Sequence, residues 1–221
     1  NKPNVKPIGN LFINRSLLKP NPNGAVLLLQ DTIPKFSYRL FAAPVSSQWL
    51  SYFNDQCKFI SKLPEKIRKN INIRLYPVDF GWSQKDRWQN KYPDIQLDYG
   101  EKKYRDKLKQ CRISISSCNA TTYLESLSWN FPTIIFWDPE YWELNDETKP
   151  YFELLKSVKI FHETPEAAAS HLVDIWTNIQ FWWQSKDVQL AREKFCSQYS
   201  NTSKSTLRNL KILLKNNVKV D

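Results

Sequence analysis

The stretch SISSCNATTYLESLSWNFPTIIFW, residues 114–137, decides the fold class of this 221-residue chain. An apolar strand pattern at 112–116 runs through small polar residues into a helical pattern at 119–129, and a second apolar strand pattern follows at 133–137. Two strands that are joined through a helix are typical of a parallel sheet. The segment therefore predicts one β-α-β unit.

The same alternation continues on both sides of this unit. Further strand patterns occupy 24–30, 71–77, 95–99 and 159–163, and helical patterns occupy 47–63, 101–110, 145–157, 164–183 and 187–199. Residues 82–90 fit either a weak helix or a loop. Thr164 is the expected N-cap of one helix, with Pro165 at its first position. Pro150 is expected to kink or split another. We predict an α/β, Rossmann-like fold with a mostly parallel sheet, helices on both faces and additional C-terminal helices.

The length allows one such domain with helical additions rather than two domains. Residues 1–23 contain four prolines and are predicted to be a lead-in or linker. Residues 24–185 form the predicted Rossmann-like domain, and 186–221 form a C-terminal helix and a basic tail. The abrupt opening NKPNVKPIGN suggests the later part of a longer protein.

The composition excludes some classes of protein and leaves others open. No apolar run approaches 18 residues, so no membrane-spanning helix is expected. The four cysteines are far apart and form no CxxC pair, which favours reduced thiols in a cytoplasmic protein over a zinc site or a disulfide framework. A net charge of +10 implies an anionic partner, either nucleic acid, a membrane surface or a phosphorylated substrate. The alternative is a solvated basic face, mainly in the tail.

Polar side chains gather where the strand at 112–116 ends and the next helix begins. The unpaired N–H groups and the dipole of a helix start favour a phosphate, and Ser117, Asn119, Thr121 and Thr122 add small donors. Glu125 lies one turn further on, on the same side as Thr121, where a carboxylate can accept hydrogen bonds from a ribose. In the alternative interpretation Asn119 is only an N-cap and Glu125 a solvated charge.

This pattern, with Pro132-Thr133 before the next strand, resembles the donor-nucleotide site in the C-terminal half of GT-B glycosyltransferases. More of the chain resembles a bacterial family of transferases encoded among surface-carbohydrate and lipopolysaccharide genes. The matching stretches are FSYRLFAAPVSSQWLSYF, IRLYPVDFGW, NATTYLESL, PTIIFW, YWEL, PYFELL, IFHETPEAAA and WW.

The resemblance implies a metal-independent glycosyltransferase that takes a nucleotide-sugar as substrate and needs no cofactor. The chain would be the donor half, with an acceptor-binding half before it and a closing helix that crosses back to that half. The acceptor would be a glycan or a lipid-linked glycan, the location cytoplasmic, and the basic tail would contact the inner face of the membrane; nucleic acid is not expected. Retaining GT-B enzymes often carry a second Glu eight positions before the ribose Glu. Ser117 stands there, so neither stereochemical outcome is predicted.

Other residues at predicted strand ends are candidates for substrate contact. Arg39 follows the first strand and would neutralise the leaving phosphate, whereas Arg74 fits a salt-bridged strand residue equally well. Tyr76 or Trp82 would stack on the base and Asp79 would bond to base or sugar, unless YPVDFGW is only a turn.

The segment WDPEYWEL supplies Asp138, Glu140 and Glu143, of which any one would contact sugar hydroxyls, unless these are ordinary charges at a helix start. His162 and the Trp182-Trp183 pair fit structural roles better than catalysis or sugar stacking. The sequence indicates no catalytic residue. A sugar-nucleotide hydrolase, a polyol-phosphate transferase and a non-catalytic nucleotide- or nucleic-acid-binding module stay open as alternative functions.

Overall fold

A computed structural model describes residues 16–37, 45–200 and 206–217. Its centre is a six-stranded sheet in which every neighbouring pair is parallel, in the order β3-β2-β1-β4-β5-β6. This confirms the predicted α/β, Rossmann-like fold. The strands are β1 (Ala25–Leu29), β2 (Ile71–Arg74), β3 (Gln96–Asp98), β4 (Cys111–Ser116), β5 (Thr133–Phe136) and β6 (Phe161–His162).

The strand order reverses direction between β1 and β4. β1 pairs with β2 on one side and with β4 on the other, with Leu29 beside both Arg74 and Ser116. Open α/β sheets bind ligands beyond the carboxyl ends of the strands at such a switch point. Gly24 allows β1 to begin close to β4, because a side chain there would lie 2.3 Å from the carbonyl oxygen of Gln110.

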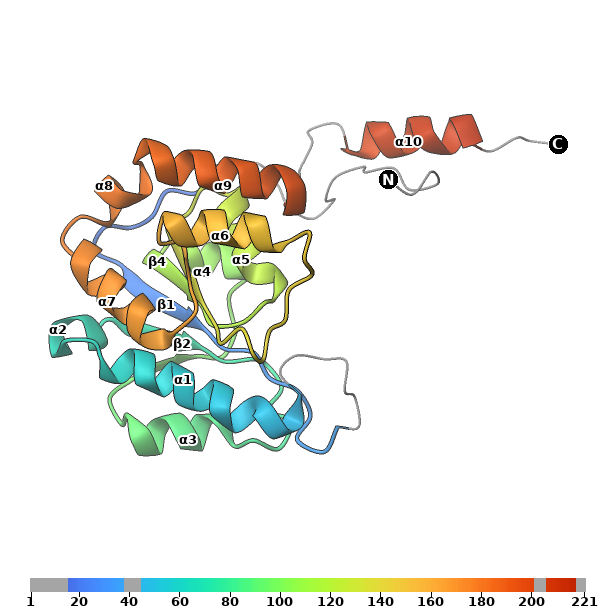
Figure 1. Cartoon of the computed structure of the whole chain (residues 1–221). Coiled ribbons are helices and arrows are strands. Elements are labelled where there is room, and N and C mark those ends of the chain that lie inside the picture. The colour runs from blue at the N-terminus through green and yellow to red at the C-terminus, as the bar shows by residue number, and fades with distance from the viewer. Residues whose placement is uncertain (1–15, 38–44, 201–205, 218–221) are drawn as a thin grey trace.

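Helices cover both faces of the sheet (Figure 1). α1 (Trp49–Ser61), α3 (Gln84–Lys91) and α7 (Pro165–Ile175) lie on one face, and α4 (Tyr104–Leu108), α5 (Thr121–Ser128), α6 (Lys149–Ser157) and α9 (Lys186–Tyr199) lie on the other. The short helix α2 (Glu65–Arg68) lies between α1 and β2 along the chain, and the short helix α8 (Ile179–Trp183) lies between α7 and α9. α10 (Thr206–Asn217) lies outside the layers.

The central strand β1 is apolar because both faces of the sheet are buried there. Val26 and Leu28 point into the large cluster beneath α1 and α7, whereas Leu27 and Leu29 point into a smaller cluster beneath α4 and α5. Trp49, Trp88 and Trp183 are fully buried and supply much of the core volume. The sheet is therefore a rigid base for the loops at its carboxyl edge.

Several local predictions need correction. The pattern at 164–183 is two helices, because Asn178 accepts a hydrogen bond from the N–H of Phe181 and so caps α8 separately from α7. Pro150 stands in the first turn of α6, where a missing N–H costs nothing, and does not kink the helix. Thr164 does cap α7, accepting from the N–H of Ala167. The predicted domain boundaries stay a prediction.

Candidate functional site

The turn from β4 into α5 leaves the helix start without a side-chain cap. The N-cap position is Ala120, which has an extended backbone and no hydrogen-bonding side chain. The alternative in which Asn119 is the N-cap is therefore wrong: its Oδ1 accepts a hydrogen bond from the Tyr123 hydroxyl at 2.8 Å. Because no side chain caps the first turn of α5, its N–H groups and the positive end of its dipole can serve an anion.

The predicted phosphate-binding residues divide into two groups. Asn119 and Thr121 are exposed and Thr122 is half-buried, so all three border the turn. The Ser117 side chain is buried: its hydroxyl donates to the carbonyl oxygen of Leu29 at 2.9 Å and lies 3.1 Å from the Tyr52 hydroxyl. Ser117 thus ties the end of β4 to the end of β1 and offers no hydroxyl to solvent.

Asp31, at the carboxyl end of β1, is a further candidate that the sequence pattern did not single out. Its backbone N–H donates to the Tyr52 hydroxyl at 2.7 Å, and its carboxylate accepts the N–H of Thr32 at 2.8 Å. Burial raises the pKa of Asp31 even though the Thr32 N–H opposes the shift. The sequence does contain a signal for Asp31, because Gln30 and Asp31 are polar residues that directly follow the buried strand β1 at the switch point.

Two buried polar atoms in the residues beside Asp31 lack a hydrogen-bond partner among the described residues. Gln30 Nε2 and Thr32 Oγ1 are buried and have no hydrogen-bond partner within the part of the chain that the structure describes. Buried polar groups are normally paired, and an exception needs an explanation such as a ligand. The end of β1 is therefore a second part of the candidate site, next to the end of β4 that leads into α5.

Glu125 lies one turn along α5, on its α4 side. The carboxylate is half-buried, and among the described residues it makes no hydrogen bond or ion pair. Burial raises the pKa of Glu125. Its neighbour is Tyr104, whose hydroxyl lies 3.0 Å from Ser114 Oγ and whose pKa is raised by burial, with a smaller contribution from Glu125.

Glu143 comes close to the same turn from the loop between β5 and α6. It is exposed and lines an open depression of about 280 Å³ together with Asn119, Tyr123, Leu124, Leu144, Asn145, Thr148, Phe152, Phe195 and Tyr199. Its neighbour Trp142 is buried and meets the Tyr52 ring edge-on, with 6.2 Å between centroids. The loop thus lies against the switch point and carries Glu143 to the α9 side of α5, away from Glu125.

The three predicted residues of the loop after β2 have different surroundings. Tyr76 is 41% exposed, so its ring is accessible. Trp82 is buried, stacks on Trp49 at 4.3 Å and donates to the carbonyl oxygen of Ile33. Such a ring is a core residue rather than a platform for a base.

Asp79 organises the same loop. It accepts backbone N–H groups from Gly81, Ser83 and Gln84. Partial burial opposes these hydrogen bonds, but together they hold the pKa of Asp79 below its usual range. Asp79 therefore serves the start of α3, as the interpretation of this segment as a turn predicts.

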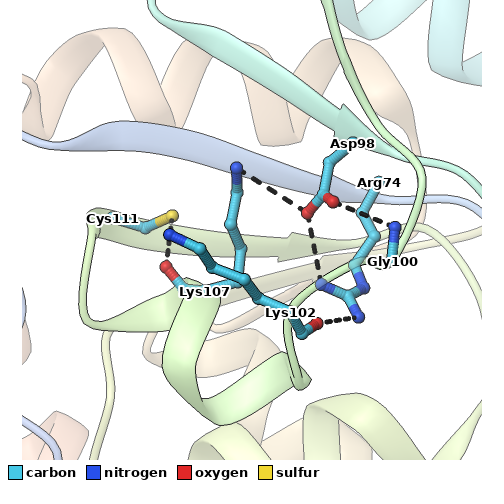
Figure 2. Close-up of polar contacts among 6 residues, drawn as sticks. All are labelled: Arg74, Asp98, Gly100, Lys102, Lys107 and Cys111. Carbon is cyan, nitrogen blue, oxygen red and sulfur yellow. Dashed lines mark hydrogen bonds and ion pairs between the residues drawn. The ribbon is translucent and has the colours of Figure 1, made fainter.

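Arg74 is engaged in a closed polar cluster at the ends of β2 and β3 (Figure 2). Its guanidinium lies 3.2 Å from Asp98 and donates to the carbonyl oxygen of Lys102 at 2.8 Å, while Asp98 also accepts from the N–H of Gly100 and lies 3.7 Å from Lys107 Nζ. Arg74 is therefore a salt-bridged strand residue. Arg39, the other basic candidate, lies outside the described residues.

His162 forms a buried pair with His171, with 3.2 Å between Nε2 of the first and Nδ1 of the second. Burial lowers the pKa of His162 to about 4 and that of His171 to about 3. Trp182 and Trp183 each donate an indole N–H to a backbone carbonyl oxygen, so both are packing residues.

Within residues 16–37, 45–200 and 206–217, no three His, Cys, Asp or Glu side chains gather in a way that could hold a metal ion. None of the helices in these ranges has the length and hydrophobicity needed to cross a membrane.

Comparison with known protein families identifies the family of this chain. No match is found among curated proteins. A family model described as "LIC12162 family transferase" matches residues 2–214, which is nearly the whole chain and includes β1, β4, α5 and the polar turn between them. The chain therefore belongs to the LIC12162 family of transferases.

Proposed function

We propose that this transferase binds a nucleotide-activated sugar at the carboxyl edge between β1 and β4 and transfers the sugar to a glycan or lipid-linked acceptor. The reaction would belong to cytoplasmic assembly of bacterial surface polysaccharide or lipopolysaccharide. The chain would supply the donor-binding part of a GT-B enzyme. A preceding part would supply the acceptor site.

One observation carries this proposal: α5 begins at the switch point without a side-chain cap, and one turn later follows the half-buried carboxylate of Glu125, which has no partner among the described residues. The N–H groups of Thr121, Thr122 and Tyr123, which no described side chain caps, match phosphate oxygens. Glu125 matches a group with two neighbouring hydroxyl donors, such as the ribose of the same nucleotide. A nucleoside diphosphate supplies both the phosphate oxygens for the N–H groups and the ribose hydroxyls for Glu125.

Asp31 fits the phosphate side of this site. Asp31 lies at the carboxyl end of β1, and burial raises its pKa. A carboxyl group that takes up a proton when a phosphate binds can donate a hydrogen bond to a phosphate oxygen. On the other side of the turn, Asn119 and Glu143 border an open depression that suits the polar hydroxyls of the sugar. We assign the base to the side of Tyr76, whose ring is accessible.

The experiment is a thermal-shift panel with UDP, CMP, CDP and GDP, followed by calorimetric titration of any hit. A ligand that binds only the folded state stabilises it by about 2.7 kcal/mol at 100 times its Kd. We expect one of the four to raise Tm clearly more than the others. If none of them shifts Tm at millimolar concentration, the chain has no nucleotide site and the proposal fails.

Nucleic-acid binding is the competing outcome for a chain with a net charge of +10. It would be independent of free nucleotides and would fall steeply with salt. A short RNA titrated at 50 and 200 mM salt separates the two, because base-selective stabilisation by a free nucleotide has no counterpart in phosphate-backbone binding.

A further inference from the structure

α10 has two different sides. At about 100° per residue, Leu207, Leu210 and Leu214 fall within an arc of about 60°. Arg208, Lys211 and Lys215 fall within a second arc of similar width, centred about 100° away. Residues 206–217 contain no Asp or Glu. The helix is therefore both amphipathic and purely basic.

Two of the three leucines on the apolar side of α10 are exposed to solvent. Leu207 is 72% exposed and Leu214 is 56% exposed, whereas Leu210 is half-buried. Figure 1 shows α10 extending beyond α9, outside the helices that cover the sheet. Neighbouring exposed leucines on a helix of 12 residues are costly in water and indicate a surface that is covered in use.

We propose that α10 lies in the surface of an anionic lipid bilayer, with its leucines among the acyl chains and its basic residues at the headgroups. A basic amphipathic helix of low overall hydrophobicity binds in this way, its apolar side about 5–10 Å into the headgroup boundary. Charge decides between occupants: residues 206–217 carry three cations and no Asp or Glu, so the helix favours an anionic surface, and a second copy of this basic helix would repel it. This inference stands on α10 alone and does not depend on the proposed function.

The test is vesicle flotation of the whole chain with pure phosphatidylcholine and with phosphatidylcholine containing 30% phosphatidylglycerol. Each basic residue near an anionic surface changes partitioning by about fivefold. We expect the anionic vesicles to retain the protein and the neutral ones to retain at least tenfold less. We also expect 0.5 M salt, which shortens the Debye length below about 5 Å, to release most of it.

Two variants and one matched control locate the binding surface. Lys211→Glu/Lys215→Glu and Leu207→Ser/Leu214→Ser should each lower partitioning at least tenfold, since one reverses the charge and the other removes the apolar contact. Ile212 is 46% exposed but lies on the far side of the helix from Leu214, so Ile212→Ser should leave binding within about twofold. Circular dichroism and Tm confirm that each variant is folded.

Three results would overturn the proposal. Equal binding to neutral and anionic vesicles removes the role of charge, and equal loss from Ile212→Ser removes the role of the leucine side. The third is a protein that ignores all vesicles but elutes as a dimer that Leu207→Ser/Leu214→Ser dissociates. In that case a second copy covers α10.

Discussion

Asp98 and Glu125 are both carboxylates close to the carboxyl edge of the sheet, and their surroundings differ. Asp98 ends β3 and has Arg74, Lys107 and the N–H of Gly100 around it (Figure 2). Glu125 is half-buried in α5, has no partner among the described residues, and has a raised pKa. A buried charge that is fully paired is explained by its structural role in the fold. A buried charge without a partner lowers the stability of the fold, so its presence points to a functional role.

Asp98→Asn should have the largest effect on stability. It keeps the shape of the side chain but leaves Arg74 and Lys107 without a negative partner. Removing one member of a largely buried ion pair costs about 3 kcal/mol or more. Urea unfolding at pH 7 should therefore show a clear fall in the free energy of unfolding.

The matched control for that variant is Asp146→Asn. Asp146 pairs with Lys149 at 2.7 Å, but its side chain is 93% exposed, so its loss should leave the urea midpoint unchanged. If Asp98→Asn moves the midpoint no further than the control does, the cluster in Figure 2 is not a structural element. The contrast with Glu125 would then disappear.

Glu125→Gln should have the opposite profile, weakening nucleotide binding without weakening the fold. A hydrogen bond to a charged group is worth about 1.5–3 kcal/mol, which corresponds to a loss of affinity of roughly 10- to 100-fold. Calorimetric titration with the nucleotide selected by the thermal-shift panel measures it. Glu166→Gln, in the first turn of α7 on the other face of the sheet, should leave the affinity unchanged.

The pH dependence of stability separates this role of Glu125 from a structural one. Because its folded-state pKa is raised, Glu125 contributes stability below pH 4.5, and that contribution is lost as the pH rises through the higher folded-state value. Glu125→Gln should remove this loss, so at pH 7 the variant should be at least as stable as the wild type. A variant that is clearly less stable at pH 7 with unchanged affinity would make Glu125 a structural residue.

The fold was predictable because short strand patterns alternate with helical patterns along the chain, and few folds accommodate that alternation. A helix over 119–129 followed from the same pattern, and the structure places it at Thr121–Ser128. Its cap did not follow, since local preference favours Asn119, whose side-chain oxygen is taken by Tyr123 in the fold. The core position of Trp82 could not be predicted for a similar reason, because only tertiary packing brings Trp49 against its ring.

The His162–His171 pair should make the fold sensitive to acid. Both folded-state pKa values lie below the ordinary 6.5, so the stability associated with the neutral pair is complete above pH 6.5 and is lost as the pH falls to about 4. Each imidazole can contribute up to about 1.4 kcal/mol per pH unit in that range. Tm measured from pH 7 to pH 4 should fall less steeply for His171→Asn, which keeps a polar side chain but does not titrate. Parallel slopes would show that other groups control the acid sensitivity.

The smallest expected effect tests the open helix start directly, through Ala120→Ser. Ala120 has the extended backbone of an N-cap residue, so a serine hydroxyl there can accept the N–H of Thr122 or Tyr123. The new cap should stabilise the fold by about 1 kcal/mol in urea unfolding. It should also weaken nucleotide binding, because it occupies an N–H group that we assign to phosphate.

Thr164→Ala provides the reverse experiment at α7, where Thr164 already accepts the N–H of Ala167. This variant should lose about 1 kcal/mol of stability and keep its nucleotide affinity, since α7 starts beside β6 and away from the switch point. Stability and affinity would then change in opposite directions at α5 and independently at α7. If Ala120→Ser gains stability and binds nucleotide as tightly as the wild type, the α5 start is an ordinary helix end and the phosphate must bind elsewhere.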